Sequence, residues 1–170
     1  MDLRAHMRSI PDFPTPGILF WDITPLLADA AALSAAIDQL TEPFKGRGVD
    51  IVSAVEARGF IFGSAVAKAL GAGFVPIRKK GKLPFETHAI SYGLEYGKDT
   101  IEVHTDAIEA GTKVLMVDDL LATGGTVAAA CELIEKLGGD IVGLTFLIEL
   151  PALKGRDKLK QYTINTVMTY

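Results

Sequence analysis

The chain has 170 residues, of which 49% are hydrophobic and 22% are charged, and this balance is typical of a single globular domain over residues 1–170. Its formal net charge of -4 excludes a chain-wide basic surface, so we expect neither a nucleic acid nor an anionic membrane as a partner. The single cysteine, Cys131, cannot close an intrachain disulfide, and no stretch approaches the ~18 apolar residues of a membrane span, so we expect a cytoplasmic protein.

Short apolar runs and helical patterns alternate along the chain. The runs predict strands over residues 50–55, 74–77, 100–104, 113–117 and 141–148. The helical patterns cover residues 30–40, 60–70 and 126–137, and Gly138 and Gly139 are expected to end the last of them. Strands that alternate with helices and are apolar on both faces predict an α/β fold, in which a mainly parallel sheet is flanked by helices. Ligands of such folds bind beyond the carboxyl ends of the strands.

Three segments do not fit this alternation. They are the proline-rich start (residues 1–28), the turn after Val55, and the polar stretch over residues 78–98. We expect these segments to be loops held on a rigid scaffold, and such loops commonly carry the functional residues.

Residues 114–126 read VLMVDDLLATGGT, an apolar strand followed by two acids and a Thr-Gly-Gly-Thr turn that opens a helix. The two glycines let backbone amides approach an anion without a Cβ in the way, the threonines offer hydroxyls, and the helix offers its positive N-terminal end. The turn therefore predicts a cradle for a monophosphate. Its residues are Ala122, Thr123, Gly124, Gly125 and Thr126.

Two adjacent carboxylates, Asp118 and Asp119, precede this cradle. Ionised carboxylates only accept hydrogen bonds, so they suit the paired hydroxyls of a ribose, or a Mg2+ ion through water. The structural alternative is that Asp119 is a local cap and the turn after it a flexible connector. Burying unpaired carboxylates at a sheet edge is costly in free energy without a ligand, which argues against this alternative. The segment predicts a ribose 5-phosphate site. The chain has no GxxxxGK[ST] or GxGxxG motif, which argues against a nucleotide triphosphatase or a dinucleotide-dependent dehydrogenase.

VLMVDDLLATGGT resembles the motif by which type I phosphoribosyltransferases bind 5-phosphoribosyl-1-pyrophosphate (PRPP). PDFPTPGILFWDITPLL near the start and LKGRDKL near the end are similar to the adenine phosphoribosyltransferases, and the resemblance covers nearly the whole chain. It implies the type I fold, a twisted, mainly parallel sheet flanked by helices, with a flexible catalytic lid loop over residues 78–98. It also implies a short irregular base-binding segment over residues 1–28.

The resemblance implies a reaction as well. Adenine and PRPP would be the substrates and AMP and pyrophosphate the products, as in purine salvage, with Mg2+ carried by PRPP and water rather than by protein side chains. The transfer would be dissociative, and the chain would form a homodimer.

A site for the departing pyrophosphate is expected after the strands over 50–55 and 74–77, whose turns carry basic residues. Taken alone, the RKKGK run is typical of a solvated loop, and Arg58 could simply pair with Glu56. The resemblance assigns a group of five residues in these turns to the pyrophosphate site, and it implies a cis peptide at Glu56–Ala57. The group is Glu56, Ala57, Arg58, Lys79 and Lys82.

The polar stretch that ends in SYGLEYGK is interpreted as a lid with glycine hinges at Gly93 and Gly97. A lid is needed because water would otherwise capture the activated ribosyl centre. The resemblance implies that Glu95 handles the proton on the imidazole ring of adenine and that Tyr96 closes the loop over the pyrophosphate side. With Arg58, they are the candidate catalytic residues.

The base is expected in the N-terminal segment, where four prolines stiffen the chain. The resemblance implies that Phe20 packs against the adenine ring and that main-chain groups of Leu19 and Trp21 contact its edge. Without the resemblance, the two aromatic residues would be interpreted as core.

Two alternatives remain open at this point. The first is a phosphoribosyltransferase for another purine base, which only the resemblance of the base-binding segment and the lid opposes. The second is a PRPP-sensing regulator that binds nucleic acid, but the acidic charge and the intact LEYG sequence argue against it.

Overall fold

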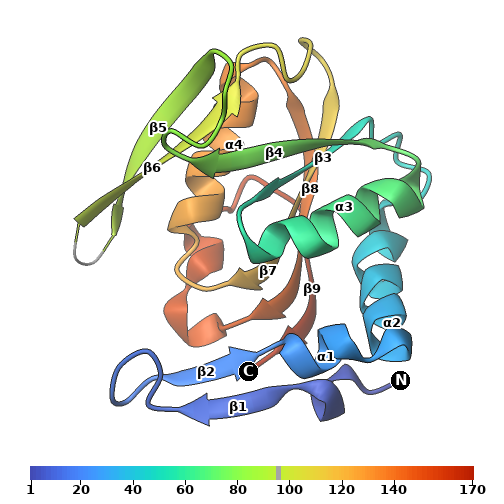
Figure 1. The fold of residues 1–170 in the computed structure, drawn as a ribbon. Coiled ribbons are helices and arrows are strands. Elements are labelled where there is room, and N and C mark those ends of the chain that lie inside the picture. The colour runs from blue at the N-terminus through green and yellow to red at the C-terminus, as the bar shows by residue number, and fades with distance from the viewer. Residues whose placement is uncertain (95–96) are drawn as a thin grey trace.

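The centre of the computed structural model, which describes residues 1–94 and 97–170, is a twisted β-sheet with helices on both faces (Figure 1). Its strands are β3 (Ile51–Val55), β4 (Gly73–Lys79), β5 (Thr87–Leu94), β6 (Gly97–His104), β7 (Lys113–Leu121), β8 (Asp140–Glu149) and β9 (Ile164–Thr169). Their order across the sheet is β5-β6-β4-β3-β7-β8-β9. The neighbouring strands β4, β3, β7, β8 and β9 pair in parallel. Strands β5 and β6 form an antiparallel hairpin, and β6 also pairs with β4 in the antiparallel sense.

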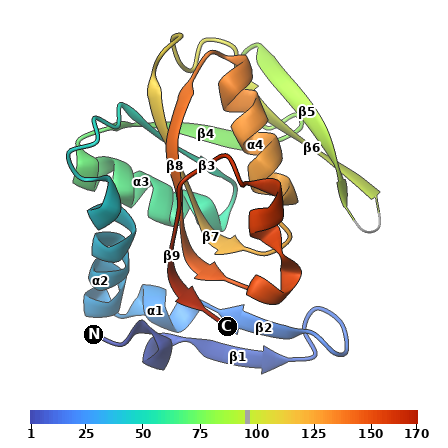
Figure 2. The same ribbon diagram turned by 180° about the vertical axis from the view of Figure 1, so that it is seen from behind.

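Helices cover both faces of this sheet. They are α1 (Thr24–Ala28), α2 (Ala30–Thr41), α3 (Arg58–Leu70) and α4 (Gly125–Lys136), with short 3-10 turns η1 (Leu3–His6), η2 (Glu42–Phe44), η3 (Pro151–Leu153) and η4 (Gly155–Lys158). Helices α2 and α3 lie on one face and α4 on the other, as Figures 1 and 2 show from opposite sides. Within the described residues, no helix is both long and apolar enough to cross a membrane.

Strand β7 shows why the sheet takes two helical layers. Successive side chains of a strand point to opposite faces, and in β7 all of them are apolar from Val114 to Val117. Val114 and Met116 join the buried cluster that contains α4, and Leu115 and Val117 join the cluster that contains α2 and α3. The predicted α/β fold with a mainly parallel sheet is confirmed.

The N-terminal segment differs from the irregular path that its prolines predict. It contains an antiparallel hairpin of β1 (Arg8–Pro11) and β2 (Leu19–Asp22), with Pro14 and Pro16 in the connecting turn, whereas Pro25 lies in the first turn of α1. Asp12 shapes that turn, because its carboxylate accepts a 2.7 Å hydrogen bond from the amide of Gly17. The hairpin lies beyond the carboxyl ends of β8 and β9 (Figures 1 and 2), where Trp21 stacks on Tyr170 with ring centroids 3.8 Å apart.

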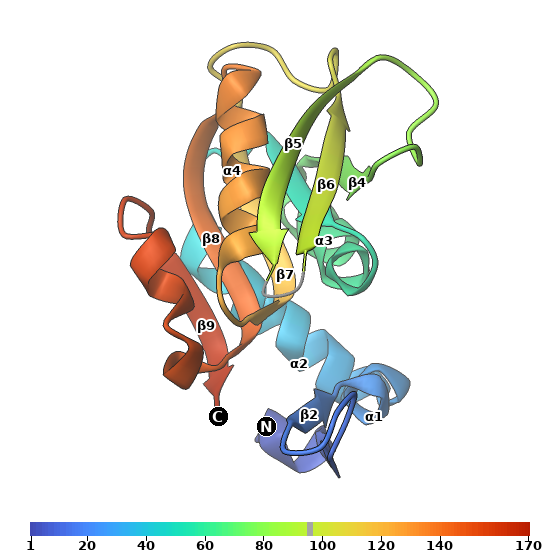
Figure 3. The same ribbon diagram turned by 90° about the vertical axis from the view of Figure 1, so that its left-hand side faces the viewer.

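The polar stretch over residues 78–98 also differs from the expected loop, since β5 and β6 occupy much of it. Alternate side chains of β5, at His88, Ile90 and Tyr92, are partly buried, while those between them are exposed. Ile90 and Tyr92 pack against the core beside α4, and Figure 3 shows β5 alongside that helix. The alternation is too short and too polar to predict a strand from the sequence. Glu95 and Tyr96 lie outside the described residues.

Candidate active site

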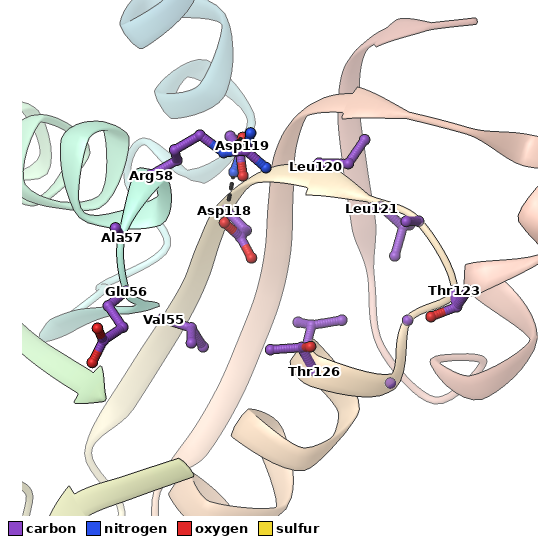
Figure 4. Close-up of a pocket in the computed structure, with 14 residues that line it drawn as sticks. Val55, Glu56, Ala57, Arg58, Asp118, Asp119, Leu120, Leu121, Thr123 and Thr126 are labelled. Atoms are coloured by element: carbon purple, nitrogen blue, oxygen red, sulfur yellow. Dashed lines mark hydrogen bonds and ion pairs between the residues drawn. The ribbon is translucent and has the colours of Figure 1, made fainter. Parts of the chain in front are cut away.

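A cavity of about 320 Å³ opens beyond the carboxyl ends of β3 and β7, where α3 and α4 begin (Figure 4). It brings together two segments that are far apart in the sequence: the turn after Val55 and the acids with the predicted phosphate cradle. The residues that line it are Val55, Glu56, Ala57, Arg58, Asp118, Asp119, Leu120, Leu121, Ala122, Thr123, Gly124, Gly125, Thr126 and Val127.

The predicted cradle forms the turn between β7 and α4. Gly124 has a φ of 78°, a left-handed conformation that favours glycine, and α4 begins at the next residue. The free amides of the first helical turn therefore face an open cavity, which is the arrangement that binds phosphate groups in other α/β proteins.

Asp118 and Asp119 lie inside β7 rather than after it, because the strand continues to Leu121. Asp119 is buried, and its Oδ2 lies 2.7 Å from Nε of Arg58. Asp118 accepts a 2.8 Å hydrogen bond from the amide of Asp119, and its side chain points into the cavity (Figure 4). Helix α3 approaches it so closely that a Cβ on Gly59 would lie 2.8 Å from its Oδ1.

Burial raises the pKa of the Asp118 carboxyl well above its ordinary value, and the neighbouring charge of Asp119 raises that pKa further. The folded chain thus holds this proton more tightly than the unfolded chain does. Consequently, the free energy of unfolding should fall as the pH rises from the ordinary aspartate pKa, about 3.9, through the raised pKa of the folded chain.

Replacing Asp118 with asparagine removes this titration while the side-chain oxygen can still accept from the amide of Asp119. We therefore expect Asp118→Asn to unfold at a higher temperature than the unaltered chain above that pH window, with the difference disappearing toward acid pH. Thermal unfolding at a series of pH values measures this. The exposed Asp38→Asn serves as the control, and an equal difference at every pH would contradict the assignment.

Glu56 turns away from Arg58. Its Oε1 accepts a 3.1 Å hydrogen bond from Nε of Arg78 and a 2.8 Å hydrogen bond from the amide of Lys79, both at the end of β4. The Glu56–Ala57 peptide is cis, as expected. Arg58 pairs instead with Asp119, so the simple Arg58–Glu56 ion pair considered from the sequence does not form.

The structure does not bring the two predicted lysines into the cavity. Lys79 extends toward the hairpin, where its Nζ lies 3.1 Å from Oδ2 of Asp99, and Lys82 is on the loop that follows β4. The hydrogen bond to Asp99 raises the pKa of Lys79. Contacts of these lysines with pyrophosphate stay a prediction.

Tyr92 connects the hairpin with the phosphate cradle. Its hydroxyl accepts a 3.1 Å hydrogen bond from Oγ1 of Thr126 and lies 3.4 Å from Oδ2 of Asp99. A series of polar contacts thereby runs from β4 to α4, through Lys79, Asp99, Tyr92 and Thr126. The sequence did not indicate Tyr92 or Asp99, because their partners become neighbours only when β6 pairs with β4 and β5 and when β5 packs against α4.

A second, smaller cavity of about 120 Å³ adjoins the first and shares Arg58, Asp119 and Leu120 with it. It contains the three residues predicted to bind the base. Phe20 lies there below the guanidinium of Arg58, which is 5.5 Å from the ring centroid. The sequence did not indicate its other apolar walls. The lining residues are Ile18, Leu19, Phe20, Trp21, Arg58, Asp119, Leu120, Ile148 and Leu150.

The mainly parallel sheet, with paired acids in β7 and a glycine turn at the start of α4 beside Arg58, has the type I phosphoribosyltransferase fold. Among residues 1–94 and 97–170, no three acidic, histidine or cysteine side chains gather closely enough to hold a metal ion.

Comparison with known proteins agrees with this class. The family model for the phosphoribosyl transferase domain matches residues 22–168. The adenine phosphoribosyltransferase of Rhodopirellula baltica is 56% identical over 170 residues, which are 100% of this chain and 82% of that protein. The adenine phosphoribosyltransferase structure from Thermoanaerobacter pseudethanolicus superposes with a TM-score of 0.96 at 50% identity and covers 99% of this chain and 98% of that one.

The Saccharomyces cerevisiae enzyme, solved with adenine and an imino-altritol bisphosphate, superposes with a TM-score of 0.93 at 42% identity, over 98% of this chain and 96% of that one. The chain belongs to the phosphoribosyltransferase family, among the adenine phosphoribosyltransferases.

Proposed function

We propose that this chain transfers the 5-phosphoribosyl group of PRPP to adenine and releases AMP and pyrophosphate. The observation that carries the proposal is the pair of adjoining cavities, one with a phosphate cradle and paired acids, the other a small apolar slot beside Phe20. A nucleoside monophosphate has the same two parts, a phosphorylated ribose and a flat base. The shared residues, Arg58, Asp119 and Leu120, lie where the two parts are joined.

In the proposed reaction, a ring nitrogen of adenine forms a bond to the anomeric carbon of the ribose as the bond from that carbon to pyrophosphate breaks. The bond to pyrophosphate breaks first to a large extent, so the transition state is dissociative. The imidazole proton of adenine is lost, and the electron pair of the broken bond stays on pyrophosphate. Catalysis therefore depends on position and charge more than on a protein nucleophile.

Each side of the cavity has a part in this proposal. The turn over residues 122–126 binds the 5′-phosphate, Asp118 and Asp119 accept hydrogen bonds from the ribose hydroxyls, and Arg58 offers charge to the pyrophosphate. The carboxylates also fit a Mg2+ ion held through water. When bound with PRPP, Mg2+ offsets negative charge on the departing pyrophosphate.

Four further residues keep their predicted roles as proposals. Lys79 and Lys82 contact the phosphates when the hairpin of β5 and β6 closes over the cavity, which requires Lys79 to leave Asp99. Glu95 takes the proton of the adenine imidazole, and Tyr96 covers the pyrophosphate side. These two roles rest on the resemblance of SYGLEYG to the same element of the family.

The test is AMP formation from PRPP and Mg2+ with adenine, hypoxanthine, guanine or xanthine offered separately. Conversion of adenine alone, with a strong loss in Glu95→Ala, is the expected result. Conversion of another purine base would retain the PRPP site and contradict the base assignment. PRPP binding without turnover of any base would indicate a regulator instead.

Replacing Phe20 with alanine should raise the KM for adenine by roughly tenfold and leave the KM for PRPP nearly unchanged, because stacking of a base on an aromatic ring contributes about 1–3 kcal/mol. Steady-state kinetics with each substrate varied in turn measure this. Ile61→Ala is the control, since Ile61 is an exposed apolar residue outside both cavities and outside residues 78–98. Equal changes in the two KM values would place Phe20 outside the base site.

We also propose that the chain forms a homodimer. Three large apolar side chains of the N-terminal hairpin, Phe13, Ile18 and Leu19, are about half exposed, and such patches commonly mark protein interfaces. Sedimentation equilibrium tests this proposal. The cytoplasmic location stays a prediction from composition.

A further inference from the structure

The LKGRDKL segment near the end of the sequence has no role in the site described so far. It covers η4 and the residues on either side of it, between β8 and β9. Figure 2 shows these short turns beside the first residues of α4, and η4 contacts that helix. The segment therefore lies directly behind the phosphate cradle.

Gly155 contacts the cradle backbone to backbone. A Cβ on Gly155 would lie 2.4 Å from the carbonyl oxygen of Ala122 and 3.2 Å from the amide nitrogen of Gly124. In the other direction, a Cβ on Gly124 would lie 2.5 Å from the carbonyl oxygen of Gly155. No side chain fits between the two segments, so the position of Gly155 determines how far the cradle can relax away from the cavity.

The next residue, Arg156, attaches this segment to the sheet. Its Nε and Nη2 each donate a 2.7 Å hydrogen bond to the carboxylate of Glu149, and Nη2 also lies 3.3 Å from Oγ1 of Thr166. Such bidentate pairs restrict orientation as well as distance. The Glu149 carboxylate is buried at the end of β8, beside the last residue of β7, from which the cradle starts.

The electrostatics agree with a persistent pair. Hydrogen bonding from Arg156 lowers the pKa of Glu149, and the same contact raises the pKa of Arg156. Both groups are therefore charged at neutral pH.

We propose that Arg156 is a positioning residue for the 5′-phosphate site: its pair with Glu149 holds Gly155 against residues 122–124 and keeps the cradle amides directed at the phosphate. The inference rests on the proposed function, because it assigns Arg156 to the phosphate half of that site. Arg156 is not among the described residues that line either part of the site, so it acts through Gly155 and not by contact with substrate.

The test compares Arg156→Gln, Arg156→Lys and the control Asp157→Asn. Asp157 lies in the same turn, but its carboxylate is 64% exposed and 4.0 Å from Lys160, so it should contribute little. Calorimetry measures binding of ribose 5-phosphate, kinetics measure kcat and the KM values for PRPP and adenine, and thermal unfolding measures stability.

We expect Arg156→Gln to weaken ribose 5-phosphate binding and raise the KM for PRPP by about 10- to 100-fold, since displacement of a positioning group by ~1 Å has effects of this size. The KM for adenine and kcat should stay within about twofold of the values of the unaltered chain. A change of that size is too small to indicate that adenine or the reacting atoms are displaced. Lysine retains the charge without the planar fork, so Arg156→Lys should recover part of the binding. Asp157→Asn should match the unaltered chain.

Normal ribose 5-phosphate binding by Arg156→Gln would overturn the inference. So would a parallel weakening of adenine and PRPP together with a lower unfolding temperature, because that result indicates general destabilisation. An unaltered chain that does not bind ribose 5-phosphate would contradict the proposed site itself. Normal binding by the unaltered chain and unchanged binding by the variant would contradict only the role of Arg156.

Discussion

Replacing Arg58 with alanine is expected to lower kcat/KM for AMP formation by about 100- to 1000-fold, the size of effect seen when a charge-stabilising group is removed from an active site. Arg58 lines both cavities, lies over Phe20 and pairs with Asp119 at 2.7 Å. Its loss therefore removes positive charge from the proposed junction between base, ribose and pyrophosphate. Steady-state kinetics with PRPP and adenine measure the change.

The same substitution should lower stability, because it leaves the buried carboxylate of Asp119 without its partner beside Asp118. Removing one partner of a fully buried pair costs about 3–5 kcal/mol, and less is expected here since the Arg58 side chain is 44% exposed. The double variant Arg58→Ala, Asp119→Ala isolates the effect on stability, which it should recover. It should remain inactive because it lacks two residues of the proposed site, and recovery of activity would contradict the proposed roles of both.

Replacing Gly124 with alanine is expected to abolish measurable binding of ribose 5-phosphate and AMP. A left-handed residue other than glycine costs roughly 1–2 kcal/mol, and the new Cβ would lie 2.5 Å from the carbonyl oxygen of Gly155. The cradle and η4 must then separate, and the amides move away from the phosphate position. Calorimetry with AMP and thermal unfolding measure both consequences.

Gly111 offers a matched control for this substitution. It has a φ of 83°, close to the 78° of Gly124, but no atom lies within 4 Å of the position of its Cβ. Gly111→Ala therefore has a similar backbone cost without the steric contact, and AMP binding should stay normal. If both variants lost the same stability and both bound AMP, the contact with Gly155 would have no part in phosphate binding.

The elements that the sequence predicts well are those with local periodic patterns. Strand β7 and helix α4 appear within a few residues of their expected bounds, because their apolar residues recur at the spacing of a strand and of a helix. The sequence predicts the second half of β6, over residues 100–104, but neither β5 nor its pairing with β6. Among the side chains of β5 that the structure describes, only Ile90 and Tyr92 pack against the core beside α4, so the pattern resembles that of a polar loop.

The candidate site divides in the same way. The cradle over residues 122–126 is one contiguous segment, and its glycines and threonines indicate an anion site without knowledge of the fold. The ion-pair partner of Arg58, in contrast, could not be predicted without the fold. Sequence proximity offered Glu56 as an alternative partner, but the parallel pairing of β3 with β7 brings the turn after Val55 beside Asp119.

The sequence by itself determined the class of fold, the glycine turn that we propose as a phosphate cradle and the paired acids, because each depends on residues that are neighbours along the chain. Only the tertiary structure decided that Arg58 pairs with Asp119, that the slot beside Phe20 adjoins the larger cavity, and that Gly155 contacts the backbone of Ala122 and Gly124. These contacts depend on strand order and on the approach of distant backbones. Strand order follows from the packing of the whole core, and no local pattern encodes it.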